Sequence, residues 1–319
     1  MPLVAIVGAG RVGTEVAEAL LLRDVADVVL IDVVPGRAEG EALDLAHEVS
    51  ILGIDREVRG STRIEDIEGS DVVVIVAGVP RKAGMKREEL LNANAGIVRD
   101  IARKVAELCP KARILVITNP VDAMTYVAWK VSGFDRRRVI GFGPLLDSAR
   151  LRYVLAKRLG KRLSSIQPLV IGQHGEAMVP VLSATLVEGV PAIQLLKKEE
   201  VEEVVKEVRE AGAEIIRLRG YSANHAPGLG AAIMVEAMVK GNPIYVPAIA
   251  VLNGEYGIKG VALGVPCIVG SSGIERVIEV ELQPFEKEML REAAKRVASL
   301  LNELPEDLRP SPGEISIEI

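Results

Sequence analysis

The stretch LVAIVGAGRVGTEVAEALLLR, residues 3–23, decides the fold of the first half of the chain. It starts as a short apolar run typical of a buried strand and ends with the apolar spacing of an amphipathic helix. Between these parts, Gly8, Gly10 and Gly13 form the pattern G-x-G-x-x-G. That pattern alone also fits a plain strand-to-helix turn. Placed between a strand and a helix, it predicts a turn that binds a dinucleotide, because phosphates can approach the backbone at the helix N-terminus.

Asp32 lies near the end of the next apolar run, VVLIDV at 28–33, and follows Gly13 by 19 residues. A carboxylate at this position can accept hydrogen bonds from the ribose diol of the adenosine, whereas it would repel a phosphate on that ribose. The predicted cofactor is therefore NAD. Arg37 stands close by in the sequence, so NADP stays open as the weaker alternative.

Apolar runs of strand length recur at 28–33, 71–78 and 113–119, with helical patterns between them. Their apolarity is continuous rather than alternating, which predicts burial on both faces, as in a parallel sheet covered by helices. Repeated strand–helix–strand units predict a doubly wound α/β domain, the Rossmann arrangement, over residues 1–144.

The second half, residues 145–319, has a different pattern. Amphipathic helical stretches come first, strand-like runs then cluster between 244 and 282, and a last helix is expected at 283–303. Because the strands follow one another directly, this half is predicted to be an α+β domain that carries the substrate. The tail at 304–319 is broken by prolines and then alternates, which fits either a disordered end or an added edge strand.

The composition is that of an ordinary globular protein, with 49% hydrophobic and 26% charged residues and a net charge of -5. The negative charge argues against a nucleic-acid partner. No apolar run reaches the roughly 18 residues of a membrane span, and the chain begins with a strand rather than a signal peptide. Cys109 and Cys267 lack metal or disulfide spacing, which predicts buried thiols, a cytoplasmic protein and no bound metal. The low aromatic content, with many Ile, Val, Glu and Arg, suggests a thermostable protein.

His174 is one of three histidines in the chain and stands between glycines in VIGQHGEAMVP, residues 170–180. Taken alone, it is most simply a loop histidine without chemistry. Its functional interpretation therefore depends on other segments of the sequence.

Three such segments carry polar residues where strands end or helices begin: ITNPVD at 117–122, GPLLDSARLR at 143–152 and GVPRKAGMKREELL at 78–91. The first ends a predicted parallel strand, where ligands gather in such sheets. Asp147 and Arg150 are three residues apart and so share one helix face. Each segment also has a plain structural explanation, as a turn, a local ion pair or a solvated basic loop.

Together and in this order, GAGRVG, RKAGMKR, TNPVD, LDSAR and GQHGE resemble the lactate/malate dehydrogenase family over nearly the whole chain. Arg81 stands where lactate dehydrogenases carry glutamine, so the chain is most similar to the lactate-dehydrogenase-like malate dehydrogenases of prokaryotes. The resemblance implies an enzyme of the tricarboxylic acid cycle that interconverts (S)-malate and oxaloacetate with NAD. It also implies a homotetramer, with a dimer as the alternative.

The resemblance further implies residue roles. His174 would be the catalytic acid/base with Asp147 as its partner, and Arg87 would polarise the reacting carbonyl. Arg150 would bind the substrate carboxylate and Arg81 the second carboxylate. The predicted substrate contacts are Arg81, Arg87, Asn119 and Arg150. The predicted cofactor contacts are Gly8, Gly10, Arg11, Val12, Gly13, Asp32, Asn94, Ile117 and Asn119.

The chemistry supports this set independently. Oxidation of a secondary alcohol removes a hydride, which NAD accepts, and a proton, which needs a base with a pKa near neutrality. Histidine has an ordinary pKa of about 6.5, and the arginine fork matches a carboxylate. Two other functions stay open: an L-lactate or broad 2-hydroxy-acid dehydrogenase, and a non-catalytic NAD-sensing protein. His47 and His225 are predicted to have packing or interface roles.

Overall fold

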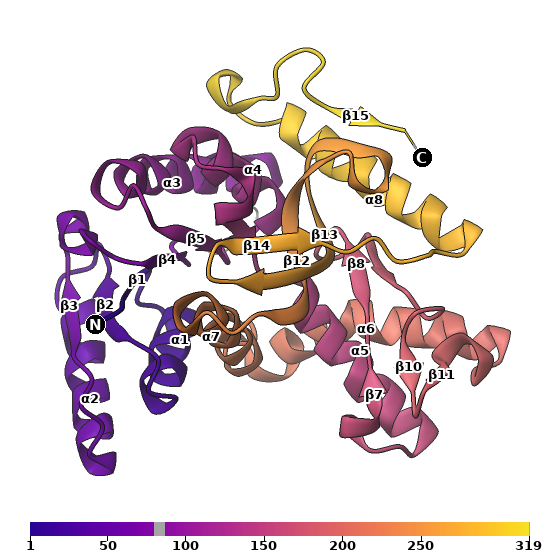
Figure 1. Ribbon diagram of the computed structural model, residues 1–319, viewed down its shortest axis with the longest axis horizontal. Coiled ribbons are helices and arrows are strands. Elements are labelled where there is room, and N and C mark those ends of the chain that lie inside the picture. The colour runs from indigo at the N-terminus through magenta and orange to yellow at the C-terminus, as the bar shows by residue number, and fades with distance from the viewer. Residues whose placement is uncertain (80–86, 319) are drawn as a thin grey trace.

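The computed structural model describes residues 1–79 and 87–318 (Figure 1). A sheet of parallel strands forms the centre of its first half. Their order in the sheet is β3–β2–β1–β4–β5–β6. Their bounds are β1 Leu3–Val7, β2 Asp27–Ile31, β3 Val58–Ser61, β4 Val72–Ile75, β5 Arg113–Val116 and β6 Val139–Gly141. Every residue of β4 is buried, as continuous apolarity predicts for a strand covered on both faces.

The chain order reverses between β1 and β4, which are neighbours in the sheet although β2 and β3 come between them in sequence. Ligands of doubly wound sheets bind outside the carboxyl ends of the strands at such a reversal. The turn at Gly8 directly follows β1, and Ala77 follows β4. The sequence pattern of the glycine turn and the sheet topology therefore indicate the same edge.

Helices cover the sheet on both faces (Figure 1). Their bounds are α1 Arg11–Leu22, α2 Arg37–Leu52, α3 Arg87–Leu108, α4 Val121–Ser132, α5 Pro144–Leu159, α6 Lys198–Arg219, α7 His225–Lys240 and α8 Pro284–Asn302. Short 3-10 turns lie at Ile64–Ile67, Arg136–Arg138, Leu163–Ser165, Ala192–Gln194, Glu255–Gly257 and Glu306–Leu308. Helix α7 packs on α1 so closely that a Cβ on Gly228 would lie 2.4 Å from the Cβ of Glu15. A helix from the second half thus covers the first.

The strands of the second half continue the same sheet. Strands β12 (Ile244–Asn253) and β13 (Ile258–Gly270) pair antiparallel, and β12 pairs with β6 at Ile249 and Gly141. Beyond β13 the sheet extends through β8 (Val170–Gly172) and β9 (Met178–Pro180), with β14 (Gly273–Val277) also on β13. The predicted fold class, a Rossmann sheet followed by an α+β part, is confirmed. The two parts share one large sheet.

A separate small sheet, β11–β10–β7, lies beside helices α5 and α6 (Figure 1). Its strands are β7 Ile166–Gln167, β10 Leu186–Val187 and β11 Val190–Pro191. A second group of buried apolar residues, separate from the main core, packs beneath it. This region supports the helix that carries Asp147.

The tail forms an added edge strand, one of the two alternatives that its sequence allows. Strand β15, Ser316–Ile317, pairs antiparallel with Ile258 and Lys259 of β13. Glu314 precedes it and accepts hydrogen bonds from the Tyr126 hydroxyl at 2.5 Å and the Lys130 ammonium at 3.3 Å, both on α4. The tail is therefore attached to a helix of the first half.

Both cysteines lie in the interior of the protein. Cys109 and Cys267 are buried free thiols, as predicted. Across residues 1–79 and 87–318, no helix combines the length and the apolarity that crossing a membrane requires.

Candidate active site

The glycine turn joins β1 to α1 and needs glycine at two of its three positions. Gly8 has a φ of +113°, and a Cβ there would lie 2.6 Å from the amide nitrogen of Ala77. A Cβ on Gly13 would lie 1.9 Å from the carbonyl oxygen of Gly8, so a side chain there is incompatible with this turn. The lack of a side chain at Gly8 and Gly13 lets the start of α1 lie close against the sheet.

Gly10 is different, because a Cβ there would meet nothing within 4 Å. It is the N-cap residue of α1 and, as a glycine, offers that helix no side-chain cap. Open space before an uncapped helix N-terminus fits a phosphate group, which would accept hydrogen bonds from the free N–H groups. Of the two next predicted cofactor contacts, Val12 is partly buried, and the Arg11 guanidinium lies 4.0 Å from the centre of the Tyr221 ring.

Asp32 follows β2 and is only 8% exposed. One carboxylate oxygen accepts the backbone N–H of Ala9, within the glycine turn, at 3.0 Å, and the other accepts that of Val34 at 2.9 Å. The Arg37 guanidinium lies farther away, at 3.4 and 3.5 Å from the two oxygens. Since each oxygen can accept a further hydrogen bond, Asp32 fits the ribose of a dinucleotide whose phosphates lie at Gly10.

His174 lies in the turn between β8 and β9, and its side chain is 18% exposed. Its Nδ1 is 2.7 Å from Oδ2 of Asp147, which is 1% exposed on α5. Arg150, one helical turn further along, donates to the other oxygen of Asp147 at 3.2 Å. The structure thus brings together the histidine, aspartate and arginine that the sequence predicts as functional residues.

The imidazole ring packs tightly on the start of α5. A Cβ on Gly143, the N-cap residue of that helix, would lie 2.9 Å from Cγ of His174. A Cβ on Gly212 of α6 would similarly lie 3.2 Å from the Arg150 guanidinium. The glycines at these two positions give the functional side chains their space. The sequence carries no signal for this role, because single glycines have no distinctive spacing.

The charges around His174 favour its protonated form. Burial by itself lowers the pKa of His174, but the charge of Asp147, its hydrogen bond and the charge of Asp122 outweigh this, so the pKa is raised. Nδ1–H donation to Asp147 leaves Nε2 as the ring nitrogen that can exchange a proton with a substrate. Arg150 lowers the pKa to a smaller degree.

Arg150 has hydrogen-bonding capacity left over. Its Nε is buried and lacks a partner among the described residues. An arginine with unused donors beside a histidine–aspartate pair is suited to bind the carboxylate of a small acid.

Asn94 belongs to α3, and its side chain reaches the segments that follow β4 and β5; Asn119 lies in the second of these segments. The Asn94 side chain accepts the backbone N–H of Val79 at 2.8 Å and donates to the carbonyl of Asn119 at 2.7 Å. Asn94 is 3% exposed and joins two loop segments, whereas Asn119 is exposed. Ile117 is 9% exposed, and its N–H donates to the carbonyl of Ile75.

Two further predicted arginines, Arg81 and Arg87, lie at or beyond the edge of the described residues. Arg81 lies outside the described residues. Arg87 is the first residue of α3, and its side chain lies outside the described part as well. Arg150 is therefore the predicted substrate-binding arginine whose contacts the structure describes.

The other histidines lie away from this cluster. His47 is exposed on α2, and His225 at the start of α7 lies 2.5 Å from the Glu15 carboxylate. Their predicted packing or interface roles remain predictions.

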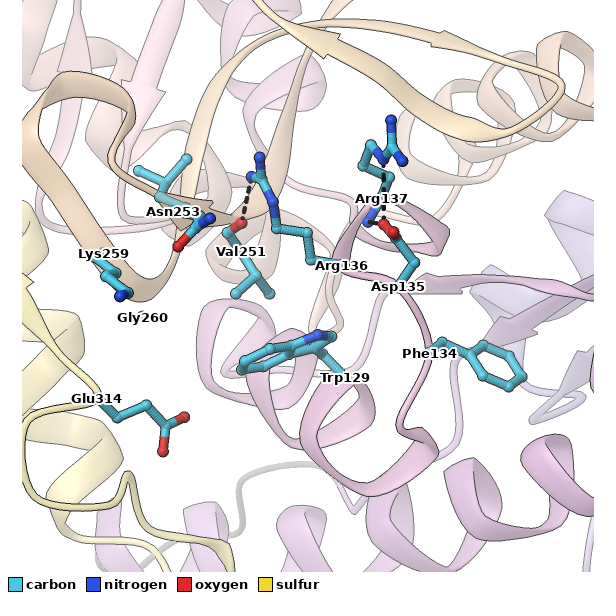
Figure 2. Close-up of a pocket in the computed structure, with 11 residues that line it drawn as sticks. Trp129, Phe134, Asp135, Arg136, Arg137, Val251, Asn253, Lys259, Gly260 and Glu314 are labelled. Atoms are coloured by element: carbon cyan, nitrogen blue, oxygen red, sulfur yellow. Dashed lines mark hydrogen bonds and ion pairs between the residues drawn. The ribbon is translucent and has the colours of Figure 1, made fainter.

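A cavity of about 540 Å³ lies elsewhere, between the end of α4, the β12–β13 hairpin and the tail (Figure 2). It contains none of the predicted site residues. Figure 2 shows Arg137 paired with Asp135 and Arg136 bonded to the carbonyl of Val251. The first hydrogen bond is 3.2 Å long and the second 2.9 Å. Because these guanidinium groups are already engaged, the cavity does not compete with the His174 cluster as a candidate active site.

Comparisons with known proteins agree with the arrangement. The family model for the lactate/malate dehydrogenase NAD binding domain matches residues 3–141, and that for the alpha/beta C-terminal domain matches residues 145–307. The NAD cofactor and the family predicted from the sequence are thus confirmed.

Individual relatives match over almost the full chain. The malate dehydrogenase of Pyrobaculum aerophilum is 47% identical over 95% of this chain and 98% of the relative. The solved structure of the malate dehydrogenase from Aeropyrum pernix has a TM-score of 0.92 at 46% identity, covering 96% of this chain and all of that one (100%). A lactate dehydrogenase from Cryptosporidium parvum, solved with lactic acid and the cofactor, has a TM-score of 0.90 at 37% identity and covers 94% of this chain and 96% of its own. The chain belongs to the lactate/malate dehydrogenase family.

Proposed function

We propose that the protein interconverts (S)-malate and oxaloacetate with NAD. The observation that carries the proposal is the His174–Asp147 pair at 2.7 Å beside Arg150, in a chain whose first turn fits a dinucleotide. Relatives at 42–47% identity over most of the chain that are named malate dehydrogenase support the same substrate.

The chain's own residues have separable tasks in this reaction. When bound, NAD⁺ supplies the acceptor for the hydride. His174 takes the alcohol proton at Nε2 in malate oxidation and returns it in oxaloacetate reduction. Asp147 holds the ring in the tautomer that has its proton on Nδ1 and stabilises the imidazolium. Arg150 orients the substrate through its carboxylate.

Residues of the glycine turn would hold the cofactor. Backbone N–H groups at Gly10 and the start of α1 would bind the pyrophosphate, and Asp32 would bind the adenosine ribose. Asn119, exposed at the end of the segment after β5, would contact both substrate and nicotinamide.

Arg81 and Arg87 complete the proposal from the sequence. Arg87 would polarise the carbonyl, and Arg81 would pair with the second carboxylate that distinguishes oxaloacetate from pyruvate. An unpaired charge in a closed site is costly. The second carboxylate of oxaloacetate therefore needs Arg81, and pyruvate, which lacks that carboxylate, would leave Arg81 unpaired and be rejected. Since the family also contains lactate dehydrogenases, this arginine determines the substrate class in the proposal.

One absorbance assay separates the candidate functions. NADH consumption is measured with oxaloacetate, with pyruvate and without substrate. We expect kcat/KM for oxaloacetate to exceed that for pyruvate by a factor on the order of 10⁴, and Arg81→Gln to narrow the ratio. Similar use of both acids would indicate a broad 2-hydroxy-acid dehydrogenase, and NADH binding without turnover would indicate an NAD sensor.

The remaining expectations also belong to this proposal. We place the protein in the cytoplasm, in the tricarboxylic acid cycle, as a thermostable homotetramer, with a dimer as the alternative. We place the boundary between the NAD-binding and substrate domains at residues 144 and 145. Light scattering after size-exclusion chromatography tests the assembly, and activity remaining after heating tests the thermostability.

A further inference from the structure

Asp122 is a buried carboxylate that the proposed reaction does not use. It is the second residue of α4 and is 1% exposed. Both of its oxygens accept the backbone N–H of His174, at 3.2 and 3.4 Å. The residue ends the TNPVD segment, and the sequence predicts no role for it.

Two carboxylates therefore hold the same histidine from different sides. Asp147 of α5 binds the ring at Nδ1, and Asp122 of α4 binds the main chain of the turn. Among the described residues, the charged groups that face the imidazole are Asp147 and Arg150 from α5 and Asp122 from α4. The arginine opposes the cationic imidazole, and both carboxylates favour it.

The charge of Asp122 depends in turn on His174. Burial raises the pKa of Asp122 to about 7, against the lowering effects of the His174 charge and of the His174 N–H. The charge of Asp147 raises this pKa further. Asp122 is thus stabilised as an anion chiefly while the imidazole is cationic, so the two groups titrate as a coupled pair.

We propose that Asp122 is a positioning residue for His174, which fixes the histidine turn on α4 and supplies a second negative charge that stabilises the imidazolium. The inference rests on the proposed role of His174 as acid/base. Asp147 sets the orientation and tautomer of the ring. Asp122 fixes the position of the His174 main chain, and its negative charge also stabilises the positive charge of the imidazolium.

The charge part of the proposal predicts opposite effects on the two reaction directions. Oxaloacetate reduction needs the imidazolium, and malate oxidation needs the neutral ring. Removing the Asp122 charge makes the imidazolium lose its proton at lower pH. The decline of reduction with rising pH and the rise of oxidation should therefore both move to lower pH.

Asp122→Asn tests this prediction, because the amide oxygen can still accept the His174 N–H while the charge is gone. The pH dependence of kcat is measured in both directions for the wild type and the variant. Above the wild-type midpoint, we expect reduction to fall to about a tenth of the wild-type rate, the size of effect that one nearby buried charge commonly has on a proton equilibrium. The midpoint of each curve does not depend on how much of the protein is folded, so partial loss of the variant leaves the test valid.

Two further variants separate charge from structure. Asp122→Glu keeps the charge, and we expect a lower rate with midpoints close to those of the wild type. Glu286→Gln is the matched control, because Glu286 is also a fully buried carboxylate (0% exposed) but binds Ser183 and Gln283 rather than the histidine. We expect this control to lower stability and leave both midpoints in place.

The outcomes distinguish this inference from the proposed function. If the wild type is active and Asp122→Asn leaves both midpoints unchanged, Asp122 has only a structural role and the inference is wrong. A wild type without turnover on oxaloacetate or malate would instead overturn the proposed function itself.

Discussion

The glycine turn occupies six consecutive residues, 8–13, whereas His174 and Asp147 are 27 residues apart and belong to different elements. In the turn, the groups that shape the binding surface are backbone atoms whose positions follow from the local chain path. In the histidine cluster they are side chains from α4, α5 and the β8–β9 turn, which only the tertiary structure brings together.

This difference has a physical consequence for mutation. A change in the glycine turn alters a binding surface whose backbone donors remain and can still attract phosphates. A change in the cluster removes a chemical group that no neighbour replaces. We therefore expect larger losses of turnover from the cluster and larger losses of cofactor affinity from the turn.

The largest effect is expected from His174→Asn. Turnover should fall by at least about 100-fold, the lower range for loss of a general acid–base group, because asparagine cannot exchange the proton. NADH affinity, measured by fluorescence titration, should stay close to that of the wild type. Turnover within a few-fold of the wild type would show that the cluster has only a structural role. The expected difference between the histidine cluster and the glycine turn would then not exist.

Asp32→Ala tests the cofactor-binding region around the glycine turn. Charge-assisted hydrogen bonds are worth roughly 1.5–3 kcal/mol each, so NADH should bind tenfold or more weakly. The preference for NADH over NADPH should narrow, since the repulsion of the extra phosphate is lost. Titration with both cofactors measures this, and kcat at saturating NADH should change little. A wild type that prefers NADPH would contradict the role given to Asp32.

The pH dependence of the wild type sharpens the comparison, because His174 gains and loses a proton in the reaction, whereas the backbone N–H groups of the glycine turn do not titrate. The pKa of His174 is raised by Asp147 and Asp122 against the effect of burial. Oxaloacetate reduction should be at full rate below this raised pKa and fall as pH rises through it. Malate oxidation should rise over the same range. NADH affinity should stay flat there, and affinity that follows the same curve would mean that the two regions are coupled.

The smallest effect is expected from Glu314→Gln in the tail, far from both regions in sequence but attached to α4, which carries Asp122. Hydrogen bonds from Tyr126, Lys130 and the Ser311 N–H hold this carboxylate. Burial raises its pKa, but these contacts outweigh burial and leave the pKa lowered. Their stabilisation is therefore present near neutral pH and lost as pH falls through the lowered pKa.

For this variant we expect a loss of about 1 kcal/mol at neutral pH, or roughly 2 °C in Tm. Calorimetry measures the change. Glu292→Gln, at an exposed pair with Lys295, is the control and should change Tm by less. Equal effects of the two variants would mean that the tail contributes no more than a surface ion pair.

The sequence by itself determined the features that depend on neighbouring residues. Continuous apolar runs predicted the buried strands, and G-x-G-x-x-G with Asp32 predicted the cofactor turn, because both follow from local backbone path and side-chain periodicity. The resemblance of their segments to a known family, rather than their spacing, predicts the roles of His174, Asp147 and Arg150.

Only the tertiary structure decided which side chains meet across elements. It placed Asp122 on the His174 N–H, Gly143 against the imidazole and Glu314 between Tyr126 and Lys130, and it continued the first sheet into β12. These contacts join residues far apart in sequence. They depend on how helices pack on the sheet and which strand ends adjoin, which local periodicity and spacing do not encode.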